Sequence, residues 1–226
     1  MGQRKLKKFA EVATFPNVFQ PAGVETNSDI VFPLKGKWNK EYFRNSNPVI
    51  LELGCGRGEY TFAMAQKLPQ QNFIGMDIKG ARIWKGAKKA LEMKLSNVAF
   101  VRNRIDFIES YFGAGEISSI WLPFPDPFPR KENRRLVSGV FLNRYLKIAS
   151  PGTTVHLKTD NRDLYLFAKE QVRLRKLTLL DACDDLYNSK EAQSIKEIEL
   201  LTGIQTYYEK QFLAIGRKIH YLSFVL

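Results

Sequence analysis

Short strand-like runs alternate with longer amphipathic segments along most of this chain. The runs lie at 49–53, 72–78, 97–102, 117–124 and 153–160, and segments with helical periodicity follow them at 58–68, 80–94, 106–112, 136–149 and 162–175. Beyond residue 176, the pattern predicts a strand near 177–183, helices around 190–200 and 205–214, and a last strand at 218–226. Strands that alternate with helices indicate βαβ units, which build a mostly parallel sheet.

Turn residues and composition set the boundaries. Pro151 and Gly152 are expected to end the helix over 136–149, and Asn161 is expected to cap the helix that follows. Residues 1–47 lack the alternation and are rich in Asn, Pro, Lys and aromatic residues. We therefore predict an N-terminal basic arm over 1–47 that packs only partly, and one α/β domain over 48–226.

Residues suited to chemistry come directly after the predicted strands. Ligands of open parallel sheets bind outside the carboxyl ends of the strands, so these residues are expected to gather at one edge. They are Gly54–Gly58 after the first strand, Asp77 after the second, Asn103 and Arg104 after the third, Asp126 after the fourth, and Thr159 and Asp160 after the fifth.

The sequence LELGCGRGEY at 51–60 carries a strand through three glycines into a helix. Two cofactor classes use such a turn, and a dinucleotide would require Gly or Ala where Glu59 stands. Glu52 would repel a pyrophosphate but would suit an ammonium or sulfonium group. The acidic-x-Gly-x-Gly-x-Gly spacing, with Asp77 placed to accept from ribose hydroxyls, resembles the first motif of S-adenosylmethionine-dependent methyltransferases. It favours this cofactor over a nicotinamide, and the remaining alternative is a tight turn without a ligand.

The charge balance points to a polyanionic partner. The chain has 226 residues with a formal net charge of +12, and its isoelectric point is about 9.7. Such a balance favours nucleic acid first and an anionic membrane second, while the plainer alternative is a solvated basic surface. With 44% hydrophobic residues the chain can build a core, which excludes wholesale disorder.

Several other features of the sequence exclude classes of protein. Cys55 and Cys183 are the only cysteines, so neither a disulfide framework nor a zinc site is expected, and no metal is predicted. No apolar run approaches the roughly 18 residues of a membrane span. The basic start lacks a secretory apolar region because Glu11 interrupts it, and Leu6 stands where a myristoylation signal needs Ser or Thr. We expect a cytoplasmic protein with no membrane partner.

Four prolines alternate through WLPFPDPFPRKENRR at 121–135 and enclose one carboxylate, Asp126. Proline fixes its own φ and cannot donate to a sheet, so this segment is predicted to be a stiff loop after the fourth strand. A basic run follows the loop at once. One interpretation is a surface turn whose aspartate caps a local N–H, and the other is a rigid support for a carboxylate beside a polyanion.

Five segments occur in an order that is specific to one family: LELGCGRGEYTFAMA, NFIGMDIKGARI, FPDPFPRKENRR, HLKTDNRDL and TYYEKQFLAIG. Together they resemble the tRNA (guanine-N7)-methyltransferases, which form 7-methylguanosine in the variable loop of tRNA. The resemblance runs from about Phe15 to the C-terminus. It implies the class I S-adenosylmethionine-dependent methyltransferase fold, which is Rossmann-like, with a mostly parallel seven-stranded sheet, helices on both faces, and tRNA as the partner.

The resemblance also implies a set of site residues. Asp126 would be catalytic. The cofactor would contact Glu52, Gly54, Gly56, Gly58, Asp77, Ile78, Asn103, Arg104 and Asp126. The substrate would contact Arg130, Thr159, Asp160, Thr206, Tyr208 and Glu209, and the RNA backbone would contact Lys131, Arg134 and Arg135.

The chemistry of guanine N7 agrees with these roles. N7 carries a lone pair and no proton, so its methylation needs alignment rather than a general base. Positive charge moves onto the purine during transfer, and the Asp126 carboxylate would stabilise it there. A carboxylate at Asp160 or Glu209 would accept from N1–H and N2–H₂, which adenine cannot satisfy. Plainer interpretations stay open, namely helix-start chemistry for Asp160 and a solvated helix position for Glu209.

The chain departs from the family pattern near the site. Phe128 replaces a tryptophan that usually follows the FPDP motif, so an aromatic residue remains. Arg104 stands where the family usually offers Asp or Asn to the adenine amino group, and arginine cannot accept a hydrogen bond. Asn103, Asp106 or a backbone carbonyl would have to accept instead.

Two other functions stay open from the sequence. One is methylation of an exocyclic amine, because those enzymes carry an Asn/Asp-Pro-Pro-aromatic loop distantly similar to PDPF. The other is a non-catalytic tRNA-binding subunit that kept the fold, against which the intact Glu52, Asp77 and Asp126 argue. We expect a monomer or homodimer with no obligatory protein partner.

Overall fold

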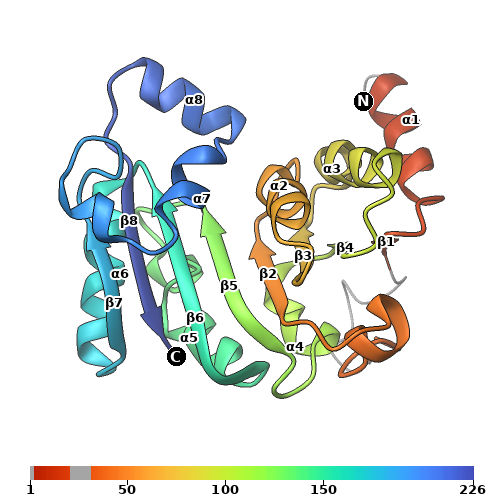
Figure 1. The fold of residues 1–226 in the computed structure, drawn as a ribbon, viewed down its shortest axis with the longest axis horizontal. Helices are drawn as coiled ribbons and strands as arrows, with labels where there is room; N and C mark the ends of the chain where they lie inside the picture. Colours follow the sequence, from red (N-terminus) through yellow and green to blue (C-terminus); the bar gives the residue numbers. More distant parts are fainter. Residues whose placement is uncertain (1–2, 21–31) are drawn as a thin grey trace.

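An eight-stranded sheet forms the centre of the molecule. The computed structural model describes residues 3–20 and 32–226. In chain order the strands are β1 (Val18–Phe19), β2 (Val49–Leu53), β3 (Asn72–Asp77), β4 (Val98–Arg102), β5 (Ile117–Pro123), β6 (Ala149–Thr159), β7 (Thr178–Cys183) and β8 (His220–Val225). Across the sheet they follow the order β1-β4-β3-β2-β5-β6-β8-β7, as Figure 1 shows.

The sheet is mostly parallel, as the alternating pattern predicts. Every pair from β1 to β6 is parallel, and only β8 pairs antiparallel, with β6 on one side and β7 on the other. The predicted count of seven strands is wrong by one. The N-terminal segment adds β1, in which Val18 and Phe19 pair with Phe100 and Val101 of β4.

Helices cover both faces of the sheet, as predicted. The α-helices are α1 (Gln3–Val12), α2 (Glu59–Lys67), α3 (Gly80–Glu92), α4 (Ile108–Tyr111), α5 (Gly139–Leu146), α6 (Arg162–Leu174), α7 (Ile198–Gly203) and α8 (Tyr207–Ala214). In the described ranges there are also a π-helix, η1 (Trp38–Phe43), and three short 3₁₀ turns, η2 (Ile105–Phe107), η3 (Glu132–Arg134) and η4 (Glu191–Ser194). In the described ranges, no helix has the length and apolar character needed to cross a bilayer.

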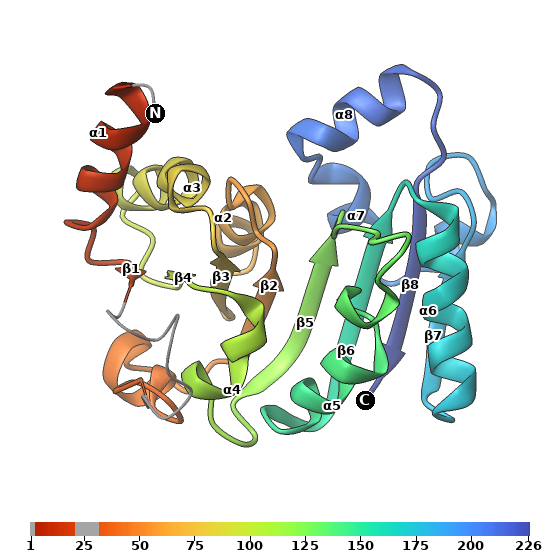
Figure 2. The same cartoon turned by 180° about the vertical axis from the view of Figure 1, so that it is seen from behind.

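Two hydrophobic cores lie on the two faces of the sheet. In β2, Val49, Leu51 and Leu53 belong to the core that includes residues of α4, α5 and α6. Ile50 belongs to the core that includes residues of α2, α3 and α7. Figures 1 and 2 show these two groups of helices on opposite sides of the sheet. Because successive side chains of a strand point to opposite faces, β2 is buried along its length and holds the glycine loop at its end in place.

The segment before residue 48 contributes to the sheet and to one core. Trp38 is completely buried, and its indole N–H donates to the Tyr111 carbonyl at 3.0 Å. Helix α1 lies beside α3 (Figures 1 and 2), where the Trp84 indole donates to Glu11 at 2.8 Å. Residues 1–2 and 21–31 of the predicted arm lie outside the described residues. The domain boundary at residue 47 stays a prediction.

Several predicted helices differ from those observed. Helix α5 ends at Leu146 and β6 begins at Ala149, so Pro151 and Gly152 lie inside a strand instead of ending the helix. The chain has already joined the sheet there, because Ala149 pairs with Ile117 of β5. The predicted helices at 106–112 and 190–200 are each divided into a 3₁₀ turn and a short α-helix. The Asn161 cap is confirmed, since its side-chain oxygen accepts from the Leu164 N–H at 2.8 Å.

Candidate active site

The glycine loop forms a tight turn between β2 and α2. All three glycines have positive φ, which is +72° at Gly54, +54° at Gly56 and +65° at Gly58. Side chains with a Cβ rarely adopt this conformation, so the turn requires glycine. The N–H groups of Gly54 and Cys55 donate to the Met76 carbonyl at 2.8 and 3.1 Å, which fixes the turn against the end of β3.

Glu52 lies at the base of the loop with 3% of its surface exposed. Its carboxylate accepts from the Thr61 N–H at 2.7 Å and also from the Thr61 hydroxyl. Burial raises the pKa of Glu52 to about 8, and the hydrogen bonds from Thr61 oppose that shift only in part. A cation in the adjoining cavity would favour the ionised form of this carboxyl.

Asp77 connects the end of β3 to the glycine loop. One carboxylate oxygen accepts from the Gly56 N–H at 2.9 Å, and the other accepts from the Lys79 N–H at 2.7 Å. Each oxygen retains further acceptor capacity, because a carboxylate offers about four lone-pair positions. The predicted contact of Asp77 with ribose hydroxyls therefore stays a prediction that is compatible with these bonds.

Two adjoining cavities open at the carboxyl ends of the strands. The larger, of about 620 Å³, is lined by six of the nine residues expected at the cofactor: Gly54, Asp77, Ile78, Asn103, Arg104 and Asp126. The smaller, of about 360 Å³, is lined by Glu52, Gly54 and Gly56, and on its far side by Thr206, Tyr207 and Tyr208. The two share Gly54, Arg82 and Phe124 as walls. Gly58 lines neither and instead packs against Phe100.

Asn103 and Arg104 are engaged locally at the larger cavity. The Asn103 side chain donates to the Tyr111 hydroxyl and accepts from the Arg104 N–H at 2.6 Å. The Arg104 guanidinium forms an ion pair with Asp106 at 3.3 Å. Asp106 also lines the cavity, so both side chains predicted to accept from the adenine amino group, Asn103 and Asp106, lie at this site.

The proline loop is held at both ends. Phe124 and Phe128, which flank Asp126, adopt φ values of +53° and +39°, a conformation that is costly for residues with a Cβ. The Phe124 N–H donates to the Lys158 carbonyl at 2.7 Å. The Arg135 guanidinium donates to the Pro127 carbonyl at 2.9 Å. Asp126 itself is exposed and lines the larger cavity, so its carboxylate is presented on a constrained backbone.

The four basic residues after the loop differ in their solvent exposure. Arg130, Lys131 and Arg134 are exposed, and Arg134 also lines the larger cavity. Arg135 is buried, pairs with Glu132 at 3.1 Å and stacks over Phe167 at 4.4 Å. The Arg135 guanidinium is used inside the protein to hold the proline loop, so the predicted contact of Arg135 with the RNA backbone stays a prediction that its burial does not support.

Thr159 and Asp160, at the end of β6, are less accessible than predicted. Thr159 is buried, and its hydroxyl accepts from the Asn161 N–H at 3.1 Å, so the predicted substrate contact of Thr159 stays a prediction that its burial does not support. The Asp160 side chain is 15% exposed and forms an ion pair with Arg217 at 2.6 Å. Asp160 lines neither of the two cavities, although it follows the strand next to β5.

Glu209 lines neither of the two cavities. Thr206 and Glu209 form a capping box at the start of α8, in which the Thr206 hydroxyl accepts from the Glu209 N–H at 3.1 Å. The Glu209 carboxylate is completely buried, forms an ion pair with Lys158 and accepts from the Tyr187 hydroxyl at 2.7 Å. The alternative of a solvated position is wrong for Glu209, and its predicted base contact stays a prediction that these contacts do not support.

The Lys158 partner of Glu209 was missed from the sequence. A signal was present, because Lys158 stands inside a strand whose neighbours are buried, and a buried lysine requires an anionic partner. The sequence alone does not say which of the many carboxylates supplies it.

Comparison with known proteins places this geometry in a family. A family profile described as "Putative methyltransferase" matches residues 46–222. The tRNA (guanine-N(7)-)-methyltransferase of Bacteroides fragilis is 44% identical over 100% of this chain and 87% of its own. That of Christiangramia forsetii is 45% identical over 99% of both chains, and that of Porphyromonas gingivalis is 46% identical over 94% of this chain and 86% of its own.

Solved structures agree on the fold. The 16S rRNA methyltransferase KamB superposes with a TM-score of 0.63 at 14% identity, covering 85% of this chain and 94% of that one. A 16S rRNA methyltransferase variant from Catenulisporales acidiphilia, solved with its cosubstrate SAM, gives a TM-score of 0.56 at 12% identity and covers 84% and 89%. These likenesses confirm the class I methyltransferase fold. Sequence identity above 40% along nearly the whole chain shows more than a shared fold, and this chain belongs to the tRNA (guanine-N(7)-)-methyltransferase family.

Proposed function

We propose that this chain transfers a methyl group from S-adenosylmethionine to N7 of a guanine in tRNA, which forms 7-methylguanosine. One observation carries the proposal: Gly54, Asp77 and Asp126 line a single cavity of about 620 Å³. A cofactor on the glycine loop and a base beside the proline loop would therefore share one space. The named activity of the relatives supports the choice of base and of RNA.

The residues of the glycine loop fit S-adenosylmethionine. A Cβ added at Gly54 would meet no atom within 4 Å, so this glycine faces open space in both cavities. Glu52 supplies a buried carboxylate that suits a cationic group, and Asp77 supplies one that suits hydroxyl groups. These three residues would hold the cofactor. When bound, it supplies a methyl group carried on a positively charged sulfur.

We assign the transfer step to Asp126. Guanine N7 offers an in-plane lone pair without a proton, so the protein needs to align the base and no side chain needs to remove a proton. The Asp126 carboxylate would stabilise the positive charge that builds on the purine. Because the Phe124 and Arg135 hydrogen bonds hold the loop, little conformational freedom is lost when the base arrives.

The environment of His156 supports a reaction without imidazole catalysis. Burial lowers the pKa of His156 to about 3, so the ring is neutral at physiological pH. The ring stacks on Trp121 at 4.3 Å between centroids and forms a hydrogen bond with the Tyr221 hydroxyl at 2.7 Å. His156 is enclosed in the core and takes no part in the proposed transfer.

Guanine recognition is assigned to Asp160 together with Thr206 and Tyr208. Thr206 and Tyr208 line the smaller cavity opposite the glycine loop. The guanine N1–H and N2–H₂ donors would compete with Arg217 for the Asp160 carboxylate. Adenine offers no such pair of donors, which gives the site a physical basis for choosing guanine.

Exposed cations beside the proline loop are assigned to the RNA backbone. Lys131 and Arg134 follow Asp126 by a few residues, and Arg130 stands between them and the loop as a further substrate contact. All three are exposed, so their charged groups are available to phosphates. Phosphate contacts of this kind position a nucleic acid and supply most of its salt-dependent affinity.

Product analysis tests the proposal. The protein is incubated with methyl-labelled S-adenosylmethionine and unmodified tRNA, the RNA is digested, and the labelled nucleoside is identified. Labelled 7-methylguanosine is the expected product. Labelled methyladenosine or N2-methylguanosine would instead indicate an exocyclic-amine methyltransferase, and tRNA binding without any label would indicate a non-catalytic subunit.

A further inference from the structure

A buried ammonium group connects four elements behind the smaller cavity. Lys158 of β6 is 2% exposed, and its Nζ donates to the Tyr60 hydroxyl at 2.8 Å, to the Leu201 carbonyl and to the Glu209 carboxylate. An ammonium group has three N–H donors, and each of them has an acceptor here. The acceptors come from α2, α7 and α8, so one side chain holds three helices against the sheet.

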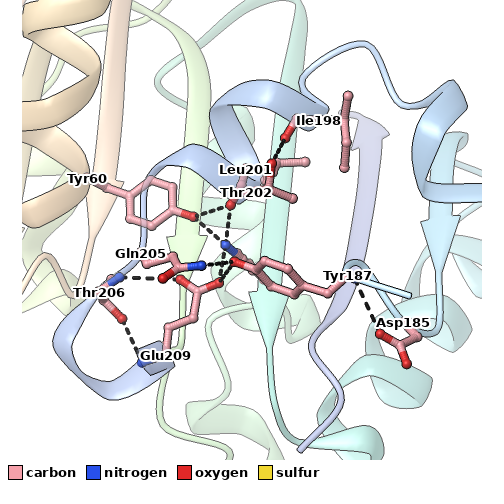
Figure 3. Close-up of polar contacts among 10 residues, drawn as sticks. Tyr60, Asp185, Tyr187, Ile198, Leu201, Thr202, Gln205, Thr206 and Glu209 are labelled. Carbon is pink, nitrogen blue, oxygen red and sulfur yellow. Dashed lines mark hydrogen bonds and ion pairs between the residues drawn. The ribbon is translucent and has the colours of Figure 1, made fainter. Parts of the chain in front are cut away.

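Both oxygens of the Glu209 carboxylate also accept hydrogen bonds. One oxygen accepts from Lys158 and from the Tyr187 hydroxyl at 2.7 Å, and the other accepts from the Thr206 N–H at 3.3 Å. Gln205 adds a bond of 3.3 Å to the Tyr187 hydroxyl. Figure 3 shows Tyr60, Tyr187 and Glu209 converging from separate segments of the chain, with Gln205 between them and Thr206 to one side.

This network places the first turn of α8 at the active site. Thr206, Tyr207 and Tyr208 line the smaller cavity, where they face the glycine loop. Contacts nearer the surface also join the start of α8 to the glycine loop and the start of α2. The Tyr207 N–H donates to Glu59 at 3.0 Å, and the Arg57 guanidinium lies 4.4 Å from the Tyr207 ring centroid. The position of α8 therefore decides the shape of the wall opposite the expected cofactor.

The buried ion pair between Lys158 and Glu209 favours one position of α8, while it adds little to the free energy of unfolding. A buried charge pair contributes little compared with apolar side chains of similar volume, because both charges lose their hydration. Its bonds are directional, however, and a shift of α8 along β6 would leave an ammonium or a carboxylate buried without a partner. Apolar contacts alone would tolerate such a shift.

We propose that Lys158 is a positioning residue, which docks α8 through Glu209 so that Thr206 and Tyr208 form the substrate wall of the cavity. Glu209 then acts as an anchor for the helix and does not contact the guanine. The inference rests on the proposed function, since the wall matters only where a base must be aligned. It differs from the assignment that the family resemblance implies for Glu209.

A paired substitution tests this role. Lys158→Met combined with Glu209→Met removes both charges and keeps similar volumes, so the fold is expected to persist. We expect amide hydrogen exchange across α8 to accelerate and kcat/KM for tRNA to fall by roughly tenfold or more, while the S-adenosylmethionine Kd changes by less than about threefold. The exposed pair Lys37–Glu41, 3.6 Å apart, provides a matched control, and its double Met variant should leave all three quantities unchanged.

A comparison of guanosine with inosine at the target position shows whether Glu209 anchors α8 or contacts the base. Inosine lacks the N2 amino group, so a carboxylate that accepts from it would distinguish the two bases. We expect the ratio of kcat/KM for tRNA with guanosine and with inosine at the target position to be the same in the double variant as in the unaltered protein. A ratio that collapses while α8 exchange stays slow would assign Glu209 to the base and overturn the proposal.

Two further results complete the test. Wild-type exchange and wild-type kcat/KM in the double variant would show that the network does not position α8. If the double variant does not fold, Tyr60→Phe removes one acceptor from the ammonium while both charges remain, and it should show the same changes on a smaller scale; unchanged values would overturn the proposal. Failure of the unaltered protein to make 7-methylguanosine would count against the proposed function alone, because the exchange measurement does not depend on it.

Discussion

At the residue scale, Asp126, Asp77 and Glu52 differ in their surroundings. Asp126 is exposed, and in the described part of the chain it has no hydrogen bond or ion pair. Asp77 holds two backbone N–H groups, and Glu52 is buried against Thr61. A free carboxylate on a stiff loop can respond to a substrate, whereas the other two are already part of the cofactor side.

Removing the charge of Asp126 should affect transfer and spare cofactor binding. We expect Asp126→Asn to lower kcat by about 10²-fold, because the amide keeps the shape of the side chain but does not stabilise a developing positive charge. Calorimetric titration with S-adenosylmethionine should give a Kd close to that of the unaltered protein. Full turnover in Asp126→Asn would remove Asp126 from its proposed role.

The raised pKa of Glu52 predicts that a proton is released when the cofactor binds. Burial raises the pKa of Glu52 to about 8, so at pH 7 the free protein holds this carboxyl mostly protonated. A cationic ligand beside it lowers that pKa, and the proton leaves as the cofactor binds. Titrations at pH 7 in phosphate and in Tris, which have different ionisation enthalpies, should differ in apparent binding enthalpy. The difference should disappear in Glu52→Gln, and equal enthalpies in the unaltered protein would contradict this account.

At the element scale, two glycines of the same turn have different roles. Gly54 faces the cavity expected to hold the cofactor, and Gly58 packs against Phe100. Both have positive φ, so alanine at either should cost about 1–2 kcal/mol of unfolding free energy. A Cβ at Gly54 would point into the open cavity, but one at Gly58 would lie 2.6 Å from the Phe100 ring. We expect Gly54→Ala to fold and to bind S-adenosylmethionine more weakly by calorimetry. Gly58→Ala should lose more stability in urea unfolding, and the opposite ranking would contradict the placement of the cofactor.

Single substitutions in the basic run should separate a residue that supports the fold, Arg135, from one that binds tRNA, Arg134. Arg135→Gln removes the bond to the Pro127 carbonyl, and we expect a loss of about 1–3 kcal/mol in unfolding free energy together with a lower kcat. Arg134→Gln should leave stability unchanged but reduce the slope of log Kd for tRNA against log salt by about one. If Arg135→Gln reduced the slope and Arg134→Gln did not, the assignment of the two arginines would be reversed.

The sequence was sufficient for the elements whose signals are local. The glycine turn, the carboxyl ends of the strands and the Asn161 cap each depend on residues within a few positions of one another, and the structure places them as expected. Arg135 could not be distinguished from Arg134, because its burial depends on Phe167, which lies on another helix. The pairing of Lys158 with Glu209 joins a strand to a helix far along the chain, so periodicity gives no access to it.

At the scale of the whole molecule, cationic side chains flank both sides of the site. Arg130, Lys131 and Arg134 follow the proline loop on one side. On the other side, a cavity of about 380 Å³ between α2, α3 and the α7–α8 segment is lined by Arg57, Lys85, Lys89 and Lys210. A chain with a net charge of +12 thus concentrates several of its cations around the edge where the cofactor loop, the proline loop and α8 meet.

Methyl transfer to a tRNA transcript in which 7-deazaguanosine replaces guanosine tests the central claim most directly. In this analogue a C–H group takes the place of N7, while the Watson–Crick edge and the exocyclic amine are unchanged. The account predicts that the ordinary transcript accepts the labelled methyl group and that the substituted transcript, although it still binds, accepts none. Equal labelling of the two transcripts would contradict transfer to N7.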